Sequence, residues 1–331
     1  MIISRTPYRV SFFGGGTDYP VWYREHGGAV LSTTIDKYCY ISIRELPPFF
    51  DHRYRVVYSI VENVQEISEI KHPAVRAILE WLDVRRGVEI HHDGDLPARS
   101  GVGSSSAFTV GLLSAVHALE GQYTSKDALA QEAIHVEQCL LREAVGLQDQ
   151  VSAAFGGFNH VTIRPDGAFQ VNPVVIPHGR VDDLQGHLLL LFTGIARTAA
   201  EVAQTMLDNV GNREAELHAL QQMVDRAIEI LTSATTDLKE FGHLLHESWI
   251  LKRELSPRVS NSTIDGLYER ARRAGAVGGK LLGAGGGGFM LLFVPPGDRA
   301  NVAAALGDMI RVPFKFDASG SRVVLYQPDG W

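Results

Sequence analysis

The chain has 331 residues, of which 45% are hydrophobic and 21% are charged. This length and composition fit a globular protein with a large core, organised as one large or two moderate domains. Its 31 Lys and Arg residues and 38 Asp and Glu residues give a net charge of −7, and they form no basic block. That charge balance argues against a nucleic-acid-binding surface.

The two cysteines, Cys39 and Cys139, lack the spacing of a disulfide framework or a zinc site. The N-terminus has no basic region followed by an apolar region, so we expect no signal peptide. Apolar runs stay shorter than the ~18 residues of a membrane span. We therefore expect a cytoplasmic enzyme with no membrane partner.

The first part of the chain is rich in β-branched and aromatic residues between turn signals, which predicts strands. These strands cover residues 8–13, 28–33, 38–44 and 54–59. Apolar spacing then predicts helices at 75–82, 104–120, 125–143 and 147–155. A strand at 88–92 lies between the first and the second of these helices. A hairpin of strands at 158–163 and 169–171 follows.

The prolines and glycines of residues 173–186 predict a junction between an N-terminal domain, 1–178, and a C-terminal domain, 179–331. A buried strand at 188–192 begins the second part. Helical patterns follow at 198–209, 213–232, 237–254 and 261–274. The chain closes on strands at 288–294, 312–316 and 323–326, with a helix at 299–310. We expect two α+β domains with a ligand cleft at their junction.

The most informative segment is the glycine- and serine-rich loop at 96–108, which leads into the predicted helix at 104–120. Its serines occupy positions typical of N-caps, and its glycines let a large anion approach the backbone. A helix N-terminus with free N–H groups binds phosphate. The loop therefore predicts a nucleotide triphosphate site, the alternative being a simple helix cap. The predicted site comprises Ser100, Gly101, Val102, Gly103, Ser104, Ser105 and Ser106.

A second glycine cluster lies near the C-terminus. Gly283, Gly285 and Gly288 have the spacing of a dinucleotide fingerprint, but the apolar run after them predicts a strand instead of a helix. Lys280 is followed by Leu281, which excludes a Walker loop. The cluster instead predicts a tight backbone turn beside the nucleotide.

Four segments, at 5–20, 96–108, 146–150 and 279–289, resemble in the same order the motifs of the GHMP superfamily of small-molecule kinases. The resemblance implies a two-domain fold, with an N-terminal domain like ribosomal protein S5 domain 2 and a ferredoxin-like C-terminal domain. It also implies ATP and Mg²⁺ as cofactors and a sugar or sugar phosphate as acceptor. The third motif would place Gly283, Gly285, Gly286 and Gly287 beside the nucleotide.

The resemblance also implies catalytic roles. Asp149 would be the general base and Arg9 its cationic partner, although Asp149 could orient the acceptor more than deprotonate it. A serine and a helix glutamate would hold Mg²⁺. We expect Ser105 and Glu137, with Ser104 or Ser106 and with Glu132 or Glu143 as alternatives.

Asp18 matches the sugar-binding aspartate of galactokinase-like enzymes, and Gly15, Gly16 and Thr17 precede it. Galactokinase carries Glu and His where this chain has the two glycines, which puts galactose in doubt. The opening segment is most similar to the D-glycero-D-manno-heptose 7-phosphate kinases, which phosphorylate an anomeric hydroxyl. Arg197 or Lys37 would then bind the distal phosphate of the substrate.

Three alternatives stay open at this point. Fucokinase-like and octose kinases share parts of the opening segment. A non-catalytic protein of the same fold would bind a ligand without turnover. The oligomeric state is open as well, with a homodimer among the choices.

Overall fold

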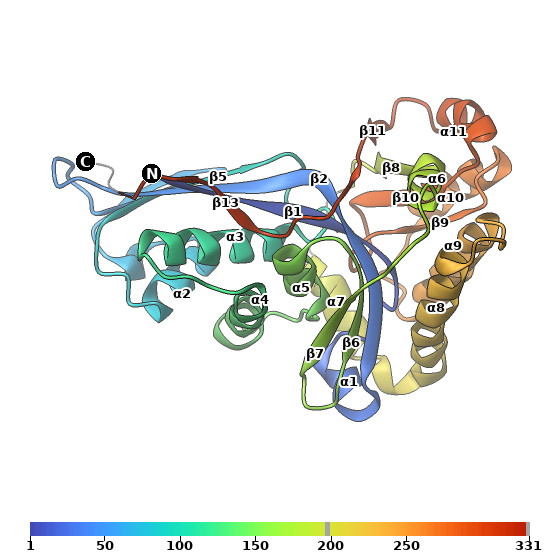
Figure 1. Ribbon diagram of the computed structural model, residues 1–331, viewed down its shortest axis with the longest axis horizontal. Coiled ribbons are helices and arrows are strands. Elements are labelled where there is room, and N and C mark those ends of the chain that lie inside the picture. The colour runs from blue at the N-terminus through green and yellow to red at the C-terminus, as the bar shows by residue number, and fades with distance from the viewer. Residues whose placement is uncertain (196–198, 329–331) are drawn as a thin grey trace.

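A computed structural model describes residues 1–195 and 199–328. Figure 1 shows two lobes, each with a β-sheet and packed helices. The larger lobe holds a nine-stranded sheet and the smaller lobe a four-stranded sheet, which confirms the α+β class. Across the described residues, none of the helices is both long and apolar enough to cross a membrane.

Two long strands form the centre of the large sheet. β1 (Ile2–Phe13) runs antiparallel to β2 (Gly28–Glu45), and the sheet order is β13-β1-β2-β5-β3-β4. The other strands of this sheet are β3 (Tyr54–Val57), β4 (Val61–Val64), β5 (Val88–Gly94), β6 (Phe158–Ile163), β7 (Phe169–Pro173), β12 (Phe316–Asp317) and β13 (Arg322–Tyr326).

The sequence predicted two strands where β2 is continuous over 18 residues. β2 pairs with β6 over its first part and with β5 over its last part. Between these two parts of β2, the Thr34 hydroxyl donates to the carbonyl of Asp317, and the Thr34 N–H donates to the carbonyl of Gly157. These partners keep the middle of β2 extended, and they come from segments far away in the sequence.

The helices of the large lobe lie along one face of its sheet (Figure 1). α3 (Ser104–Leu119) is almost entirely buried and packs against β1 and β2. The remaining helices of this lobe are α1 (Pro20–His26), η1 (Ile67–Glu69), α2 (Pro73–Trp81), α4 (Lys126–His135), the π-helical turn η2 (Val136–Leu140) and α5 (Gln148–Phe155).

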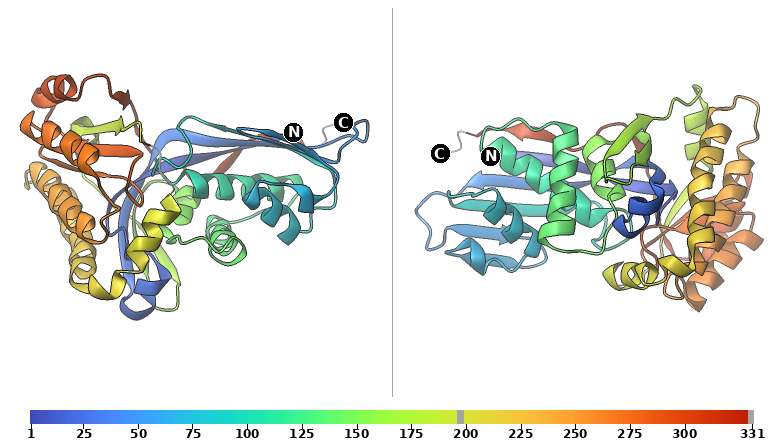
Figure 2. Two further views of the ribbon diagram at one scale, coloured as in Figure 1. Left: turned by 180° about the vertical axis from the view of Figure 1, so that it is seen from behind. Right: turned by 90° about the horizontal axis from the view of Figure 1, so that it is seen from below.

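The small sheet has the order β11-β8-β10-β9 with antiparallel neighbours. Its strands are β8 (Leu188–Phe192), β9 (Gly278–Leu281), β10 (Phe289–Phe293) and β11 (Ile310–Val312). This order is that of a ferredoxin-like sheet, as the resemblance implied. Figure 2 shows the long helices α8 and α9 side by side against this lobe. The helices in this part of the chain are α6 (Arg180–His187), α7 (Ala199–Leu207), η3 (Val210–Asn212), α8 (Glu214–Thr232), α9 (Lys239–Glu254), α10 (Ser262–Arg273), η4 (Pro296–Asp298) and α11 (Arg299–Leu306).

The end of the chain returns to the large lobe. β12 (Phe316–Asp317) pairs with β2, and β13 (Arg322–Tyr326) pairs with β1. The predicted division at residue 178 assigned these strands to the C-terminal domain, whereas in the structure they pair with strands of the large sheet. The boundary itself stays a prediction. The helix α6 occupies the predicted junction, where Leu184 is fully buried.

Candidate active site

A cavity of about 310 Å³ lies between the two lobes and brings the sequence motifs together. The large lobe contributes β1, the loop before α1, the N-terminus of α3 and the start of α5. The small lobe contributes α7, α9, β9 and the third motif. Lining residues include Arg9, Gly15, Gly16, Asp18, Ser104, Ser105, Ser106, Asp149, Lys252, Lys280 and Gly283.

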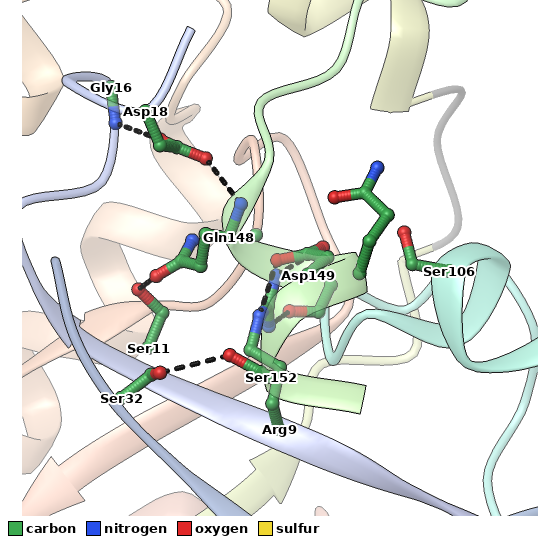
Figure 3. Close-up of polar contacts among 12 residues, drawn as sticks. Arg9, Ser11, Gly16, Asp18, Ser32, Ser106, Gln148, Asp149 and Ser152 are labelled. Atoms are coloured by element: carbon green, nitrogen blue, oxygen red, sulfur yellow. Dashed lines mark hydrogen bonds and ion pairs between the residues drawn. The ribbon is translucent and has the colours of Figure 1, made fainter. Parts of the chain in front are cut away.

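Arg9 on β1 and Asp149 in the first turn of α5 form an ion pair inside this cavity (Figure 3). Arg9 Nε donates to Asp149 Oδ1 at 2.7 Å, and Arg9 Nη2 donates to Oδ2 at 2.8 Å. The third nitrogen, Nη1, donates to the carbonyl of Gly101 at 2.6 Å. The Arg9 side chain is 4% exposed and that of Asp149 28%. The bidentate pair therefore fixes the carboxylate while leaving part of it open to the cavity.

The serine loop presents its backbone to the same cavity. Gly103, with φ 74°, is the N-cap of α3, so the serines do not cap the helix as the sequence predicted. A Cβ at Gly103 would lie 3.1 Å from Arg9 Cγ, so only glycine lets the loop approach the ion pair freely. The N–H groups of the first turn of α3 have no intrahelical partner, which suits an anion.

The glycines of the third motif hold it against the serine loop. Phe289 donates its N–H to the carbonyl of Ser100 at 3.0 Å. A Cβ at Gly288 would lie 2.1 Å from that carbonyl oxygen, and one at Gly283 would lie 2.5 Å from Gly101 Cα. Of the four glycines that the sequence placed beside the nucleotide, Gly283 lines the cavity. The other three, Gly285, Gly286 and Gly287, contact Val259 or Ile195.

Glu137 lies in the π-helical turn η2 and is fully buried beneath the serine loop. Its Oε2 accepts a hydrogen bond from Ser106 Oγ at 2.9 Å and from Gln150 Nε2 at 2.5 Å, whereas Oε1 has no partner among the described residues. Burial raises the pKa of Glu137 to about 7. An unpartnered carboxylate oxygen beside a serine hydroxyl fits a hard cation such as Mg²⁺.

The serine beside Glu137 is Ser106, which is buried, while Ser105 is exposed at the cavity. The structure therefore favours Ser106, one of the alternatives, over Ser105 as the partner of Glu137. Of the alternative glutamates, Glu132 hydrogen-bonds to His117 at 2.6 Å. Glu143 lines the cavity, where it is partly exposed, and its partial burial raises its pKa.

Asp18 is 4% exposed in the cavity wall. Its carboxylate accepts hydrogen bonds from the N–H groups of Gly16 at 3.1 Å and Gln148 at 3.4 Å (Figure 3). A Cβ at Gly146 would lie 1.9 Å from Asp18 Oδ2, so a side chain there would displace the carboxylate. Burial, aided by the charge of Asp149, raises the pKa of Asp18 to about 6. Thr17 is buried and donates its hydroxyl to the carbonyl of Gly14, which stabilises this loop.

The sequence predicted Arg197 or Lys37 as the ligand of a substrate phosphate. Lys37 Nζ donates to Asp36 Oδ1 at 3.0 Å, and Lys37 is not among the cavity-lining residues in the described part of the chain. This geometry gives no support to Lys37, and its role stays a prediction. Arg197 lies outside the described residues.

The sequence analysis did not predict two lysines that lie in the cavity wall. Lys252 on α9 is 7% exposed, and Lys280 on β9 is 3% exposed. A lysine in an amphipathic helix is typically solvent-exposed, so the pattern around Lys252 gave no signal. Lys280 entered the sequence argument only through the exclusion of a Walker loop.

Two domain families match the chain. The family of GHMP kinases N terminal domains matches residues 61–157, and that of GHMP kinases C terminal domains matches residues 218–311. Together the matches cover more than half of the chain. They contain the serine loop, Glu137, Asp149, Lys252 and the third motif.

Similar proteins span nearly the whole chain. The D-glycero-alpha-D-manno-heptose 7-phosphate kinase of Campylobacter jejuni is 29% identical over 316 residues, covering 92% of this chain and 93% of that protein. A mevalonate kinase of Pyrococcus abyssi is 30% identical over 248 residues, covering 72% of this chain and 69% of that protein. The crystal structure of a D-glycero-D-manno-heptose 1-phosphate kinase from Bacteroides thetaiotaomicron has a TM-score of 0.79 at 25% identity, covering 98% of each chain. These likenesses confirm the two-domain fold that the motifs implied.

Proposed function

Because this chain belongs to the GHMP kinase family and is therefore a phosphotransferase, we propose that it transfers the γ-phosphate of ATP to the anomeric hydroxyl of D-glycero-D-manno-heptose 7-phosphate. The observation that carries this proposal is the Arg9–Asp149 pair, which lies in one cavity with the N-terminus of α3 and with Asp18. The likeness to the Campylobacter jejuni kinase over 92% of the chain supports the choice of sugar. The cytoplasmic location stays a prediction.

In this proposal the backbone of the serine loop binds the triphosphate. The N–H groups of the first turn of α3 donate to phosphate oxygens, and the glycines at 101 and 103 keep the backbone accessible. Ser106 and Glu137 would hold Mg²⁺, and the unpartnered Oε1 of Glu137 supports that assignment. When bound, the ion neutralises charge on the phosphates of ATP.

Asp149 accepts the proton of the acceptor hydroxyl while the hydroxyl oxygen attacks the γ-phosphorus of ATP. The bond from the γ-phosphorus to the β–γ bridging oxygen breaks in the same step, and ADP leaves. Each carboxylate oxygen accepts one hydrogen bond from Arg9 and keeps a further lone pair. The guanidinium also donates to the carbonyl of Gly101, so it ties the base to the phosphate-binding loop. An anomeric hydroxyl suits this arrangement, because it is more acidic than an ordinary alcohol.

Asp18 would bind the sugar, because a carboxylate accepts hydrogen bonds from two hydroxyl groups. The absence of side chains at Gly15 and Gly16 in the neighbouring loop would allow a sugar larger than galactose. At Gly15 the nearest atom to a built Cβ is Ser11 Oγ, at 3.8 Å.

The test compares kcat/KM for heptose 7-phosphate, free heptose, mannose, fucose and galactose with ATP and Mg²⁺. We expect heptose 7-phosphate to exceed free heptose by a factor on the order of 10³, because a site built for a phosphate rejects a ligand that lacks it. Equal rates with the two heptoses, or a preference for fucose, would overturn the substrate. ATP binding that ignores Mg²⁺, with no turnover of any sugar, would favour the non-catalytic alternative.

A further inference from the structure

The small lobe places two buried lysines in the wall of the cavity. Lys252 comes from α9 and Lys280 from β9, and the exposed fractions of these residues are 7% and 3%. The catalytic pair and Asp18 come from the large lobe, so the lysines enter the site from the other side of the cleft. A buried ammonium group is costly unless it has partners that compensate its charge.

The partners of these lysines are backbone carbonyls. Lys252 Nζ donates to Leu281 O at 3.1 Å and to Gly283 O at 2.5 Å. Lys280 Nζ donates to Phe12 O at 2.8 Å. An ammonium has three N–H donors, so these bonds leave one donor on Lys252 and two on Lys280. Across residues 1–195 and 199–328, neither lysine forms an ion pair with a carboxylate.

The charges around the cavity compensate the two ammonium groups only in part. Arg9 and Asp149 neutralise each other in their bidentate pair, and the one other buried carboxylate in the described lining is Asp18. Arg99 and Glu143 also line the cavity, where they are exposed and carry opposite charges. The innermost part of the site therefore has an excess of positive charge when both lysines are protonated.

The protonation of both lysines reflects this environment. Burial and the nearby charge of Arg9 lower the pKa of Lys252 to about 7, while Asp18 and Asp149 oppose that shift. Burial, together with the charges of Lys252 and Arg9, lowers the pKa of Lys280 as well. An anion bound between them would favour their charged forms, so its binding would draw in protons.

We propose that Lys252 and Lys280 form a second phosphate-binding subsite, which faces the catalytic pair from the small lobe and is separate from the serine loop. The ligand is a phosphate group with two negative charges. It has two sources under the proposed function, on which this inference rests: the phosphate already carried by the acceptor, or the γ-phosphoryl group in transfer.

Calorimetry on the full chain tests the subsite. Heptose 7-phosphate, free heptose and inorganic phosphate are titrated separately at pH 8 in two buffers that differ in ionisation enthalpy. At this pH a sugar phosphate is already a dianion, so proton uptake reports on the protein. If the subsite takes the acceptor phosphate, we expect uptake with both phosphate compounds; if it takes the γ-phosphoryl group, we expect uptake with inorganic phosphate but not with heptose 7-phosphate. Free heptose should give none in either case.

Four variants separate the charge of the lysines from a structural role. Lys252→Met and Lys280→Met remove a charge each, Lys252→Arg keeps a charge that does not titrate, and Lys239→Met is the control. Lys239 is exposed at the start of the same helix. For an acceptor phosphate, we expect Lys252→Met and Lys280→Met to weaken heptose 7-phosphate binding by at least about 10-fold and leave free heptose binding unchanged. Lys252→Arg should retain most of the affinity and lose the proton uptake.

If the lysines instead contact the γ-phosphoryl group, binding of both sugars stays constant in Lys252→Met while kcat falls for both. The subsite would be overturned if Lys252→Met and Lys280→Met both showed affinity, kcat and proton uptake within about twofold of the values for the Lys239→Met control. Failure of the proposed function gives a different result. In that case no heptose is phosphorylated, but inorganic phosphate still binds, and the proton uptake that accompanies its binding still depends on Lys252. A circular dichroism spectrum checks that each variant is folded, and Lys252→Arg keeps the test decisive if the Met variant is not.

Discussion

The two walls of the cavity are built in different ways. In the large lobe the chemistry comes from short segments whose charged groups have partners, Arg9 with Asp149 and Ser106 with Glu137. In the small lobe Lys252 and Lys280 come from separate elements and meet only backbone carbonyls. The charged side chains of the first wall are thus paired with one another, although Glu137 Oε1 has no partner among the described residues, whereas the lysines of the second wall keep unused donors. This difference suggests that the large lobe carries out the reaction and that the small lobe senses the charge of the ligand.

The largest expected effect comes from breaking the first wall at its ion pair. Asp149→Asn keeps the shape of the side chain but accepts no proton, so we expect kcat to fall by a factor on the order of 10³. ATP affinity should change by less than about fivefold, because the serine loop binds through its backbone. Single-turnover measurements of phosphoryl transfer test this. A kcat within about fivefold of the wild type would mean that Asp149 orients the acceptor and is no general base.

The second prediction separates the two walls from each other. Gly288 has φ +91°, and a Cβ there would lie 2.1 Å from Ser100 O. Gly288→Ala should therefore lower the free energy of unfolding by on the order of 2–4 kcal/mol and weaken ATP binding, because the third motif must move off the serine loop. Denaturant unfolding and ATP titration measure both effects. Gly297→Ala is the control, since a Cβ at that position meets no atom within 4 Å.

The sequence predicted much of the large-lobe wall. It predicted the helix after the serine loop, and the proximity of Arg9 to Asp149 is confirmed by their hydrogen bonds. It did not fix which serine meets Glu137. Successive residues in a helix are rotated by about 100°, so an error of one residue in where the helix begins changes the serine that faces the core.

The small-lobe wall could not be predicted, for a different physical reason. The positions of Lys252 and Lys280 depend on the packing of α9 against β9, which no local pattern encodes. The same limit explains the continuous β2, whose middle is held by residues of a distant segment. Local motifs thus predicted the serine loop and the catalytic pair, whereas residues brought together by tertiary contacts were missed.

A third prediction uses pH to test the buried carboxyl of the first wall. Glu137 has a pKa raised from its usual 4.5 to about 7, so its contribution to stability is full below pH 4.5 and is lost as the pH rises through 7. Glu137→Gln does not titrate. The variant should therefore gain stability relative to the wild type as the pH rises, by on the order of 1–3 kcal/mol at pH 8.

Urea unfolding of both proteins from pH 5 to pH 8 measures this difference. Asp18 also has a raised pKa, but its effect is common to the two proteins and cancels. Mg²⁺ with ATP should stabilise the wild type more than the variant, because the ion favours the charged carboxylate. A stability difference that stays constant with pH would contradict the assignment of the titration to Glu137.

The smallest expected effect concerns a cation outside both walls. Lys37 pairs with Asp36 at 3.0 Å and is half-buried on β2, away from the cavity lining. Lys37→Met should therefore change kcat/KM for heptose 7-phosphate by less than about twofold, and it should lower stability by less than about 1 kcal/mol, as is typical of such pairs. Steady-state kinetics with phosphorylated and free heptose measures the effect. A loss above about tenfold that is confined to the phosphorylated sugar would support Lys37 as a phosphate ligand, and it would mean that the lobes rearrange when substrate binds.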